Sequence, residues 1–304
     1  MKVVVTGSES FIGKELQKHC RSRGIEVAGI DLVPGGGAVY FQADIRSRDV
    51  AGAIPEGADA LIHLAAVSRD QDCRRDLVEA FDVNIGGTIN LIRAAQEKKV
   101  KQFIFASSEW VYGNAADGGI QTEEDPIDVT KMTSEYAMSK IIGERLLFVH
   151  HQRGLCPVTV LRFGIVYGPR PKPMSAVEGI FNEVRTLDKL EIKGSLRSGR
   201  RFIHVADIAE GIISAVGRRN GFEIFNVSGN RLVTFGEIIE QSAILLDRHP
   251  EIVETNPNAL NIRNPDNAKA KKILGWEPKI ELARGLKTLW DYQRTGGNDR
   301  GGNS

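Results

Sequence analysis

The sequence predicts an α/β protein with a doubly wound parallel sheet and a smaller C-terminal α/β lobe. A β-branched run at residues 3–5 ends in a glycine turn that opens a helical pattern, and short apolar runs then alternate with helical patterns as far as residue 163. The chain has 304 residues, of which 41% are hydrophobic, so it can bury a sizeable core. This alternation is typical of parallel strands joined by helical crossovers on both faces.

The first strand, turn and helix form a candidate cradle for an anion. The valine run ends before Gly7, a polar turn follows, and a helical pattern begins at Phe11. Backbone N–H groups and the helix dipole at such a turn favour a bound phosphate. Gly7 permits the tight turn, and Gly13 lets the helix pack close to the strand. Ser10 stands where the usual pattern has its middle glycine, so the turn alone also fits an ordinary strand-to-helix connection.

The second predicted strand, residues 25–31, ends in an acidic residue. Asp31 follows the glycine turn by about 20 residues, the spacing at which a carboxylate accepts from both ribose hydroxyls of an adenosine. A carboxylate there repels a 2′-phosphate, which favours NAD over NADP as the cofactor. The alternative is a polar turn residue at the end of a strand.

Further strands and helices are expected in alternation. We expect strands at residues 39–43, 60–66, 102–108 and 158–163, and helices at residues 76–96 and 134–151. Ligands of such sheets bind beyond the carboxyl ends of the strands. The informative strand ends are therefore Gly7, Asp31, Asp44, Ala65, Ala66, Ser107, Ser108, Phe163 and Gly164.

The pattern changes after residue 168. Pro169, Pro171 and Pro173 punctuate a loop, and short helical patterns follow at residues 174–187, 207–216 and 235–246. We therefore expect an NAD-binding domain at residues 1–168 and a substrate-binding lobe at residues 169–295 that shares some sheet elements with it. The glycine-rich residues 296–304 are expected to be disordered.

Composition excludes several classes of protein. Lys and Arg number 40 and Asp and Glu 39, for a net charge of +1, so neither nucleic acid nor an anionic membrane surface is an expected partner. The three scattered cysteines argue against a disulfide framework or a metal site and suit a reducing cytoplasm. We expect no secretory signal and no membrane span, because the apolar runs are too short.

Candidate acid–base chemistry lies at Tyr136 and Lys140. Residues four apart share one face of a helix, so the phenol and the ammonium can point at one site. A nearby ammonium and the charged nicotinamide ring favour the phenolate and lower its pKa, so that the tyrosine can take a proton from a substrate hydroxyl. Ser108 ends a strand at the same edge of the sheet, where its hydroxyl could bind the reacting oxygen. The alternatives are a surface Tyr–Lys pair and a capping serine.

Family-like motifs extend over most of the chain. They are Thr6-Gly7 with Phe11-Ile12-Gly13, Asp44-Ile45, His63-Leu64-Ala65-Ala66, Val83-Asn84, Ser107-Ser108 with Val111-Tyr112-Gly113, Tyr136 with Lys140, Leu161-Arg162 with Val166-Tyr167-Gly168-Pro169, residues 200–207, residues 225–227 and residues 272–278. Together they resemble the extended short-chain dehydrogenase/reductases, in the group of NAD-dependent nucleotide-sugar epimerases and dehydratases. The resemblance implies a Rossmann fold and covers residues 2 to about 289.

The resemblance also implies roles for individual residues. Ser108, Tyr136 and Lys140 match its catalytic triad, and Arg200 matches a basic residue that meets the nucleotide diphosphate of the substrate. Cofactor contacts are implied for Gly7, Ser10, Phe11, Ile12, Gly13, Asp31, Asp44, Ile45, Leu64, Ala65, Ala66, Asn84, Ser107, Tyr136 and Lys140. Substrate contacts are implied for Ser108, Glu109, Ile165 and Arg200.

Departures from the family pattern affect the substrate more than the cofactor. Ile165 stands where many sugar epimerases have an asparagine, and Arg201 replaces a frequent aspartate. Residues 254–262 lack the Arg-Pro-Gly-Asp pattern that often holds the second phosphate, although Arg263 lies close. Dehydratases carry Asp-Glu after the triad hydroxyl, whereas here the pair is Glu109-Trp110, so elimination of water is disfavoured. Glu109 is either an auxiliary acid or a turn carboxylate.

Three classes of function follow from these residues. The first is an NAD-dependent epimerase of a UDP-, GDP- or dTDP-linked sugar, acting at C4 through a transient keto-sugar. The second is a nucleotide-sugar reductase, dehydrogenase or dehydratase of the same family, and the third is a non-catalytic NAD-binding regulator. An intact Ser-Tyr-Lys set argues against the third. The resemblance also implies a homodimer in which the helices at residues 76–96 and 134–151 pair across a two-fold axis.

Overall fold

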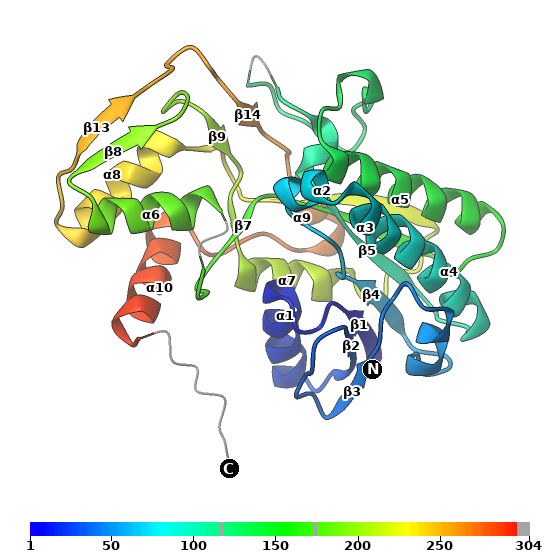
Figure 1. Ribbon diagram of the computed structural model, residues 1–304. Helices are drawn as coiled ribbons and strands as arrows, with labels where there is room; N and C mark the ends of the chain where they lie inside the picture. The colour runs from blue at the N-terminus through cyan, green and yellow to red at the C-terminus, as the bar shows by residue number, and fades with distance from the viewer. Residues whose placement is uncertain (116–117, 173–174, 297–304) are drawn as a thin grey trace.

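A seven-stranded parallel sheet forms the larger part of the protein (Figure 1). The computed structural model describes residues 1–115, 118–172 and 175–296. The strand order is β3-β2-β1-β4-β5-β6-β11, and every neighbouring pair is parallel. The strands are β1 (Lys2–Thr6), β2 (Glu26–Asp31), β3 (Val39–Gln42), β4 (Ala60–His63), β5 (Phe103–Ser108), β6 (Val158–Phe163) and β11 (Phe222–Val227). The order reverses between β1 and β4, and ligands of open α/β sheets bind at such a switch point.

Helices cover both faces of this sheet, as the alternation predicts. Those beside the sheet are α1 (Phe11–Ser22), α2 (Asp70–Arg75), α3 (Leu77–Phe81), α4 (Thr88–Glu97), α5 (Glu135–Gln152), α7 (Val205–Ala215) and α9 (Ala268–Leu274), with short 3₁₀ turns η1 (Arg48–Ala53), η3 (Glu109–Tyr112) and η4 (Val129–Lys131). Val4 packs with Leu91 of α4, whereas its neighbour Val5 packs with Leu16 of α1 and Ile208 of α7. Side chains alternate between two buried faces, which is why the strands read as continuous apolar runs.

The predicted helix at residues 76–96 is not one regular helix. It consists of α3, a π-helical segment η2 (Asp82–Gly87) and α4. Within the π segment the Asn84 side chain binds the backbone N–H and C=O of Val67 and the hydroxyl of Ser139. Such π segments mark places where a side chain is held out of regular register, and apolar periodicity alone does not reveal them. Helix α2 was also not expected, and β4 ends at His63 rather than at residue 66.

Among the residues that the structure describes, the smaller lobe contains three short sheets and three helices. Its strands are β7 (Val166–Tyr167) with β10 (Ile203–His204), β8 (Lys189–Ile192) with β13 (Glu251–Glu254), and β9 (Gly199–Arg200) between β12 (Val233–Thr234) and β14 (Ile262–Arg263). Its helices are α6 (Ala176–Thr186), α8 (Phe235–Leu246) and α10 (Leu282–Arg294). They enclose a separate core that includes Phe181, Ile238 and Leu286. Between these elements the chain returns to the large sheet with α7, β11 and α9.

The sequence also supports two expectations, one about the C-terminal tail and one about membrane-spanning helices. The expected disordered tail lies outside the described residues apart from Gly296. Across residues 1–115, 118–172 and 175–296, no helix is both long enough and apolar enough to cross a membrane.

Candidate active site

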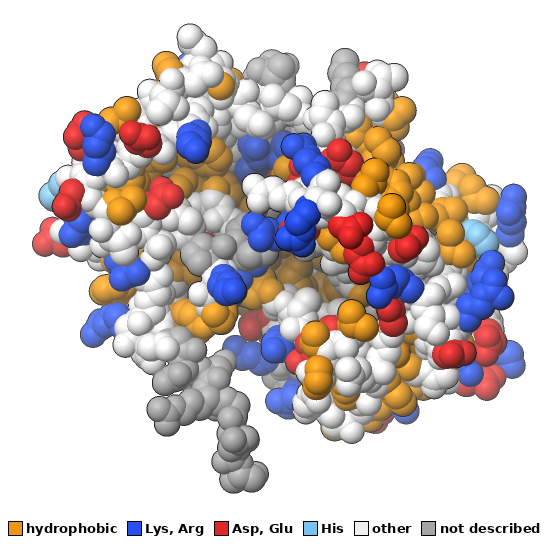
Figure 2. All heavy atoms as spheres, in the orientation of Figure 1, with side chains coloured by type: hydrophobic (Ala, Val, Ile, Leu, Met, Phe, Trp, Pro, Cys, Tyr) orange, Lys and Arg blue, Asp and Glu red, His pale blue; other side chains and the backbone are white. Residues whose placement is uncertain are grey.

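A cleft of about 700 Å³ runs along the carboxyl ends of the large sheet. Residues that follow β1, β2, β4, β5 and β6 line it, so the cleft lies where the strand alternation predicts a ligand. Acidic side chains line one end of the cleft, namely Glu9, Asp31, Asp44 and Glu79. The basic residues Arg69, Lys140 and Arg170 line it farther along. On the face shown in Figure 2, Lys and Arg side chains gather around the hollow between the two parts of the molecule.

Backbone geometry explains the glycine turn at the acidic end. Gly7 has a φ of +70°, and a Cβ atom there would lie 2.7 Å from the backbone nitrogen of Ala65. At Gly13 a Cβ atom would lie 2.2 Å from the carbonyl oxygen of Gly7, so α1 packs against the turn only with glycine there. Ser10 has a φ of −67°, which any residue adopts, and its hydroxyl accepts a hydrogen bond of 3.1 Å from the Gly13 N–H. The serine therefore caps α1.

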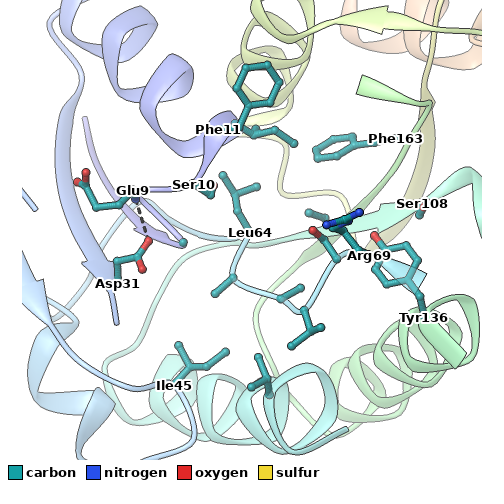
Figure 3. A pocket seen from close by; sticks show the side chains of 18 of the residues that line it. Glu9, Ser10, Phe11, Asp31, Ile45, Leu64, Arg69, Ser108, Tyr136 and Phe163 are labelled. Atoms are coloured by element: carbon teal, nitrogen blue, oxygen red, sulfur yellow. Dashed lines mark hydrogen bonds between the residues drawn. The ribbon is translucent and has the colours of Figure 1, made fainter. Parts of the chain in front are cut away.

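Asp31 faces this turn from the end of β2 (Figure 3). Its Oδ2 accepts from the Glu9 N–H at 2.8 Å, and its Oδ1 accepts from the Leu32 N–H at 2.8 Å. The cation that lines this part of the cleft, Arg46, is held by Asp44 and Glu79 at 2.6 Å each. The hydrogen bond from Arg46 lowers the pKa of Asp44. This end of the cleft thus presents carboxylates, and the positive charge of Arg46 is already balanced by two of them.

The structure brings Ser108, Tyr136 and Lys140 together at the other end of the cleft (Figure 3). Ser108 ends β5, while Tyr136 and Lys140 lie one turn apart on α5, which is capped by the Ser134 hydroxyl at 3.1 Å from the Ala137 N–H. The Lys140 Nζ lies 5.7 Å from the centre of the Tyr136 ring. A hydrogen bond with Ser108 favours the ionised form of Tyr136.

The pKa of Tyr136 is raised in the free protein, whereas the sequence predicts that Lys140 and the nicotinamide ring lower it. Burial raises it to about 12, and the hydrogen bond with Ser108 opposes only part of that shift. Burial also lowers the pKa of Lys140 to about 8. Desolvation therefore outweighs the opposing effects, which are the Ser108 hydrogen bond for Tyr136 and the charges of Cys73 and Glu144 for Lys140. Lowering the pKa of the phenol therefore requires positive charge beyond that of Lys140.

Most of the predicted cofactor contacts line the cleft, but two do not. The lining includes Gly7, Ser10, Phe11, Ile12, Asp31, Asp44, Ile45, Leu64, Ala65, Ala66, Ser107, Tyr136 and Lys140. Gly13 lies behind the turn, and the amide of Asn84 is engaged with Val67 and Ser139. Although Ser107 lines the cleft, its hydroxyl donates to Glu144 at 2.6 Å. The cofactor roles of all these residues remain predictions, and the existing hydrogen bonds of Asn84 and Ser107 leave their side chains the least available.

Two of the four predicted substrate residues lie behind the cleft wall. Ser108 and Ile165 line the cleft, whereas Glu109 and Arg200 are buried beyond it. The Glu109 carboxylate lies 3.7 Å from Nε of Arg200 and 3.8 Å from Nη1 of Arg263. Burial raises the pKa of Glu109 to about 7, although both arginines lower it. Glu109 begins the short turn η3, and its carboxylate is buried beside two arginines, so the choice between an auxiliary acid and a turn carboxylate stays open.

Sequence reasoning missed three arginines that line the cleft, namely Arg46, Arg69 and Arg170. Arg170 stacks on Phe11 at 4.3 Å, and its Nε donates to both carboxylate oxygens of Glu178 at 2.9 and 2.8 Å. It follows the Gly168-Pro169 motif, which was the available signal. Arg69 projects into the cleft near Tyr136 in Figure 3. No motif in the sequence marks Arg69.

Comparisons with known proteins agree with this geometry. The model of the NAD dependent epimerase/dehydratase family matches residues 3–228. UDP-glucuronate 4-epimerase of Thermodesulfobacterium geofontis is 27% identical over 96% of this chain and 95% of its own length. MoeE5 in complex with UDP-glucose and NAD has a TM-score of 0.87 at 26% identity, covering 98% of this chain and all of that one. The UDP-glucose 4-epimerase of Thermus thermophilus in complex with NAD has a TM-score of 0.82 at 29% identity, covering 97% of this chain and 99% of that one.

Proposed function

The chain belongs to the NAD-dependent epimerase/dehydratase family, and from that premise we propose that it is an NAD-dependent nucleotide-sugar epimerase acting at C4. One observation carries the proposal. The Ser108, Tyr136 and Lys140 set lies in the same cleft as the glycine turn and Asp31. A catalytic set at one end and a dinucleotide-type turn at the other are what reversible oxidation of a sugar hydroxyl requires.

The acidic end of the cleft fits NAD. Gly7 and Gly13 let the turn and the start of α1 pack tightly, because a Cβ atom at either position would meet protein backbone. The N-terminus of α1, with the backbone N–H groups of its first turn, then lies at the cleft, where it could bind a pyrophosphate. Asp31 lies where it can accept from ribose hydroxyls, and the nearby Arg46 is already paired, which favours NAD over NADP. When bound, NAD supplies reversible two-electron oxidation of an alcohol carbon. Titration of NADH and NADPH side by side tests this choice, and tighter binding of NADPH would contradict it.

In this proposal Tyr136 is the acid–base. It takes the proton of the sugar 4-hydroxyl, and it returns a proton when the hydroxyl re-forms on the opposite face. Ser108 binds the reacting oxygen, and the Lys140 ammonium favours the phenolate. The relatives named above are described with UDP-glucose or as epimerases of UDP-sugars, which supports a nucleotide sugar as the substrate. In this proposal its diphosphate binds Arg200, as the family resemblance implies, and Arg263, which lies on the other side of Glu109.

A homodimer is part of the proposal. Phe148 and Val149 of α5 are 37% and 40% exposed, and Val78 of α3 is 72% exposed, so these helices offer apolar surface to a second copy. Leu147, by contrast, is buried in the core of the large domain and is not available for pairing. Light scattering at micromolar concentration measures the state, and a monomer would contradict this part.

The test of function is product analysis. The purified protein, with NAD⁺ added, is incubated with UDP-, dTDP- and GDP-sugars, and products are identified by proton NMR. Conversion to the C4 epimer without accumulation of NADH supports the epimerase. Stoichiometric NADH with a single oxidised sugar would instead identify a net oxidoreductase, and loss of water would identify a dehydratase.

A further inference from the structure

Glu109 is a buried acid held between two arginines from the smaller lobe. It begins η3 directly after Ser108, while Arg200 lies on β9 and Arg263 on β14. Its side chain is fully buried, and neither carboxylate oxygen makes a hydrogen bond of good geometry with the described residues, although the Arg263 side chain and the Ile165 backbone lie near enough to lower its pKa. The two ion-pair distances, 3.7 and 3.8 Å, exceed those of charge-assisted hydrogen bonds. The carboxylate thus balances the charge of the two arginines without forming a short hydrogen bond to either of them.

The two arginines are positioned by other contacts. Arg200 donates to the backbone oxygen of Asn261 at 2.6 Å and to its side-chain oxygen at 2.7 Å. Arg263 stacks on Trp110 at 4.0 Å, and its Nε has no partner in the part of the chain that the structure describes. The cations repel one another, and each loses hydration on burial, so the pair needs a counter-anion.

Among the described residues, no other acid lies within ion-pair distance of both arginines. The groups that shift the titration of Glu109 are Arg263, Arg200 and the backbone of Ile165. Helix α5 also packs against η3, and there Tyr136 meets Trp110 edge-on at 6.4 Å. Lys140 lies beyond Tyr136, toward Phe105. Glu109 is the acid within ion-pair distance of both arginines, and Asp70 of α2 also acts electrostatically on Arg263.

We propose that Glu109 is the resident counter-anion of Arg200 and Arg263, and that it takes up a proton from solvent when the diphosphate of a nucleotide sugar binds these arginines. The inference rests on the proposed function, because it requires a diphosphate ligand. A second anion beside a buried carboxylate favours its neutral form. Glu109 would then act as a positioning residue whose charge matters only when the diphosphate is absent.

The sign of the pH dependence follows. The pKa of Glu109 is about 7 in the free protein, and ligand binding raises it further. Below that pKa the acid is already protonated and binding takes up no proton from this group. As pH rises above it, each binding event must protonate Glu109, so the affinity falls. From about pH 6.5 to about pH 8.5 we expect the Kd to rise roughly tenfold.

The experiment is calorimetric titration of the NAD-saturated full chain with UDP-, dTDP- and GDP-glucose, whose phosphates do not titrate near neutrality. At about pH 8, repeating each titration in buffers of different ionisation enthalpy counts the protons taken up. For the wild type we expect uptake of nearly one proton per bound ligand. For Glu109→Gln we expect almost no proton uptake and a Kd that hardly changes with pH. The matched control is Glu223→Gln. It removes a carboxylate on β11 that is paired with Arg218, and the variant should behave as the wild type.

Each outcome decides a different point. Binding without proton uptake by the wild type would overturn this inference and leave the proposed function intact. Equal uptake by the wild type and Glu109→Gln would assign the proton to another group and also overturn it. If no nucleotide sugar binds, the proposed function fails and this inference with it. If Glu109→Gln does not fold, the proton count and the pH dependence of the wild type alone decide.

Discussion

At the acidic end of the cleft the glycine turn, Asp31 and Asp44 all come from the first 44 residues. The catalytic end is lined from β5 and α5, and β9 and β14 of the smaller lobe lie behind its wall, where they contact Glu109. The first end is shaped mainly by backbone: a Cβ atom has no room at Gly7 or Gly13. The second depends on buried ionisable side chains whose pKa values differ from their usual ones, namely Tyr136, Lys140 and Glu109. Changes at the first end should therefore alter binding and stability, and changes at the second should alter turnover and pH dependence.

Tyr136→Phe should give the largest effect. The variant keeps the ring and its packing against Trp110 but loses the transferable proton. Removal of a general acid–base typically lowers kcat by ~10²–10⁴. NAD affinity and the free energy of unfolding should change little, since one hydroxyl contributes about 1 kcal/mol. Tyr292→Phe on α10 is the matched control, and near wild-type turnover by Tyr136→Phe would show that the acid–base lies elsewhere.

Lys140→Met should affect both turnover and cofactor affinity. Loss of a charged hydrogen-bonding partner costs about 2–3 kcal/mol, or roughly 30- to 160-fold. Without the ammonium the phenolate of Tyr136 is less favoured, so the basic rise of kcat should move to higher pH. The pKa of Lys140 is about 8, so the wild type itself loses this charge above that pH, and the two kcat profiles should converge there. If the midpoint of the kcat–pH profile is the same in Lys140→Met as in the wild type, Lys140 does not influence the ionisation of Tyr136.

Arg200→Ala tests the substrate side of the catalytic end. Loss of one charged phosphate contact is of order 2 kcal/mol, so the KM for a nucleotide sugar should rise roughly 30-fold while NAD affinity is nearly unchanged. Arg219→Ala, a largely exposed arginine paired with Asp59, is the matched control. An unchanged KM with every active sugar would point to a different class of substrate.

The same contrast explains how much the sequence could predict. Local motifs identified the glycine turn, Asp31 and the Tyr136–Lys140 pair, because each depends on neighbours in the chain or on one helix. The position of Glu109 between Arg200 and Arg263 depends on β9 and β14, which meet η3 only in the folded protein, so the sequence left its role open. The π segment around Asn84 was missed because apolar spacing does not report a polar side chain that binds the backbone of a distant loop.

Ser10 gives the smallest expected effect and the sharpest test of the acidic end. The serine departs from the usual glycine pattern, yet its φ of −67° requires no glycine, and its hydroxyl caps α1 through the Gly13 N–H. Ser10→Ala removes that cap and should lower the free energy of unfolding by about 1 kcal/mol, whereas Ser10→Gly should cost only about a few tenths of a kcal/mol. Denaturant unfolding and NADH titration of both variants measure the two effects.

If Ser10→Gly binds NADH much more tightly than the wild type, the serine hinders the cofactor, and its capping role compensates for a defect in the turn. If the affinities agree, the backbone alone sets cofactor binding at this end, and the departure from the pattern is neutral for binding.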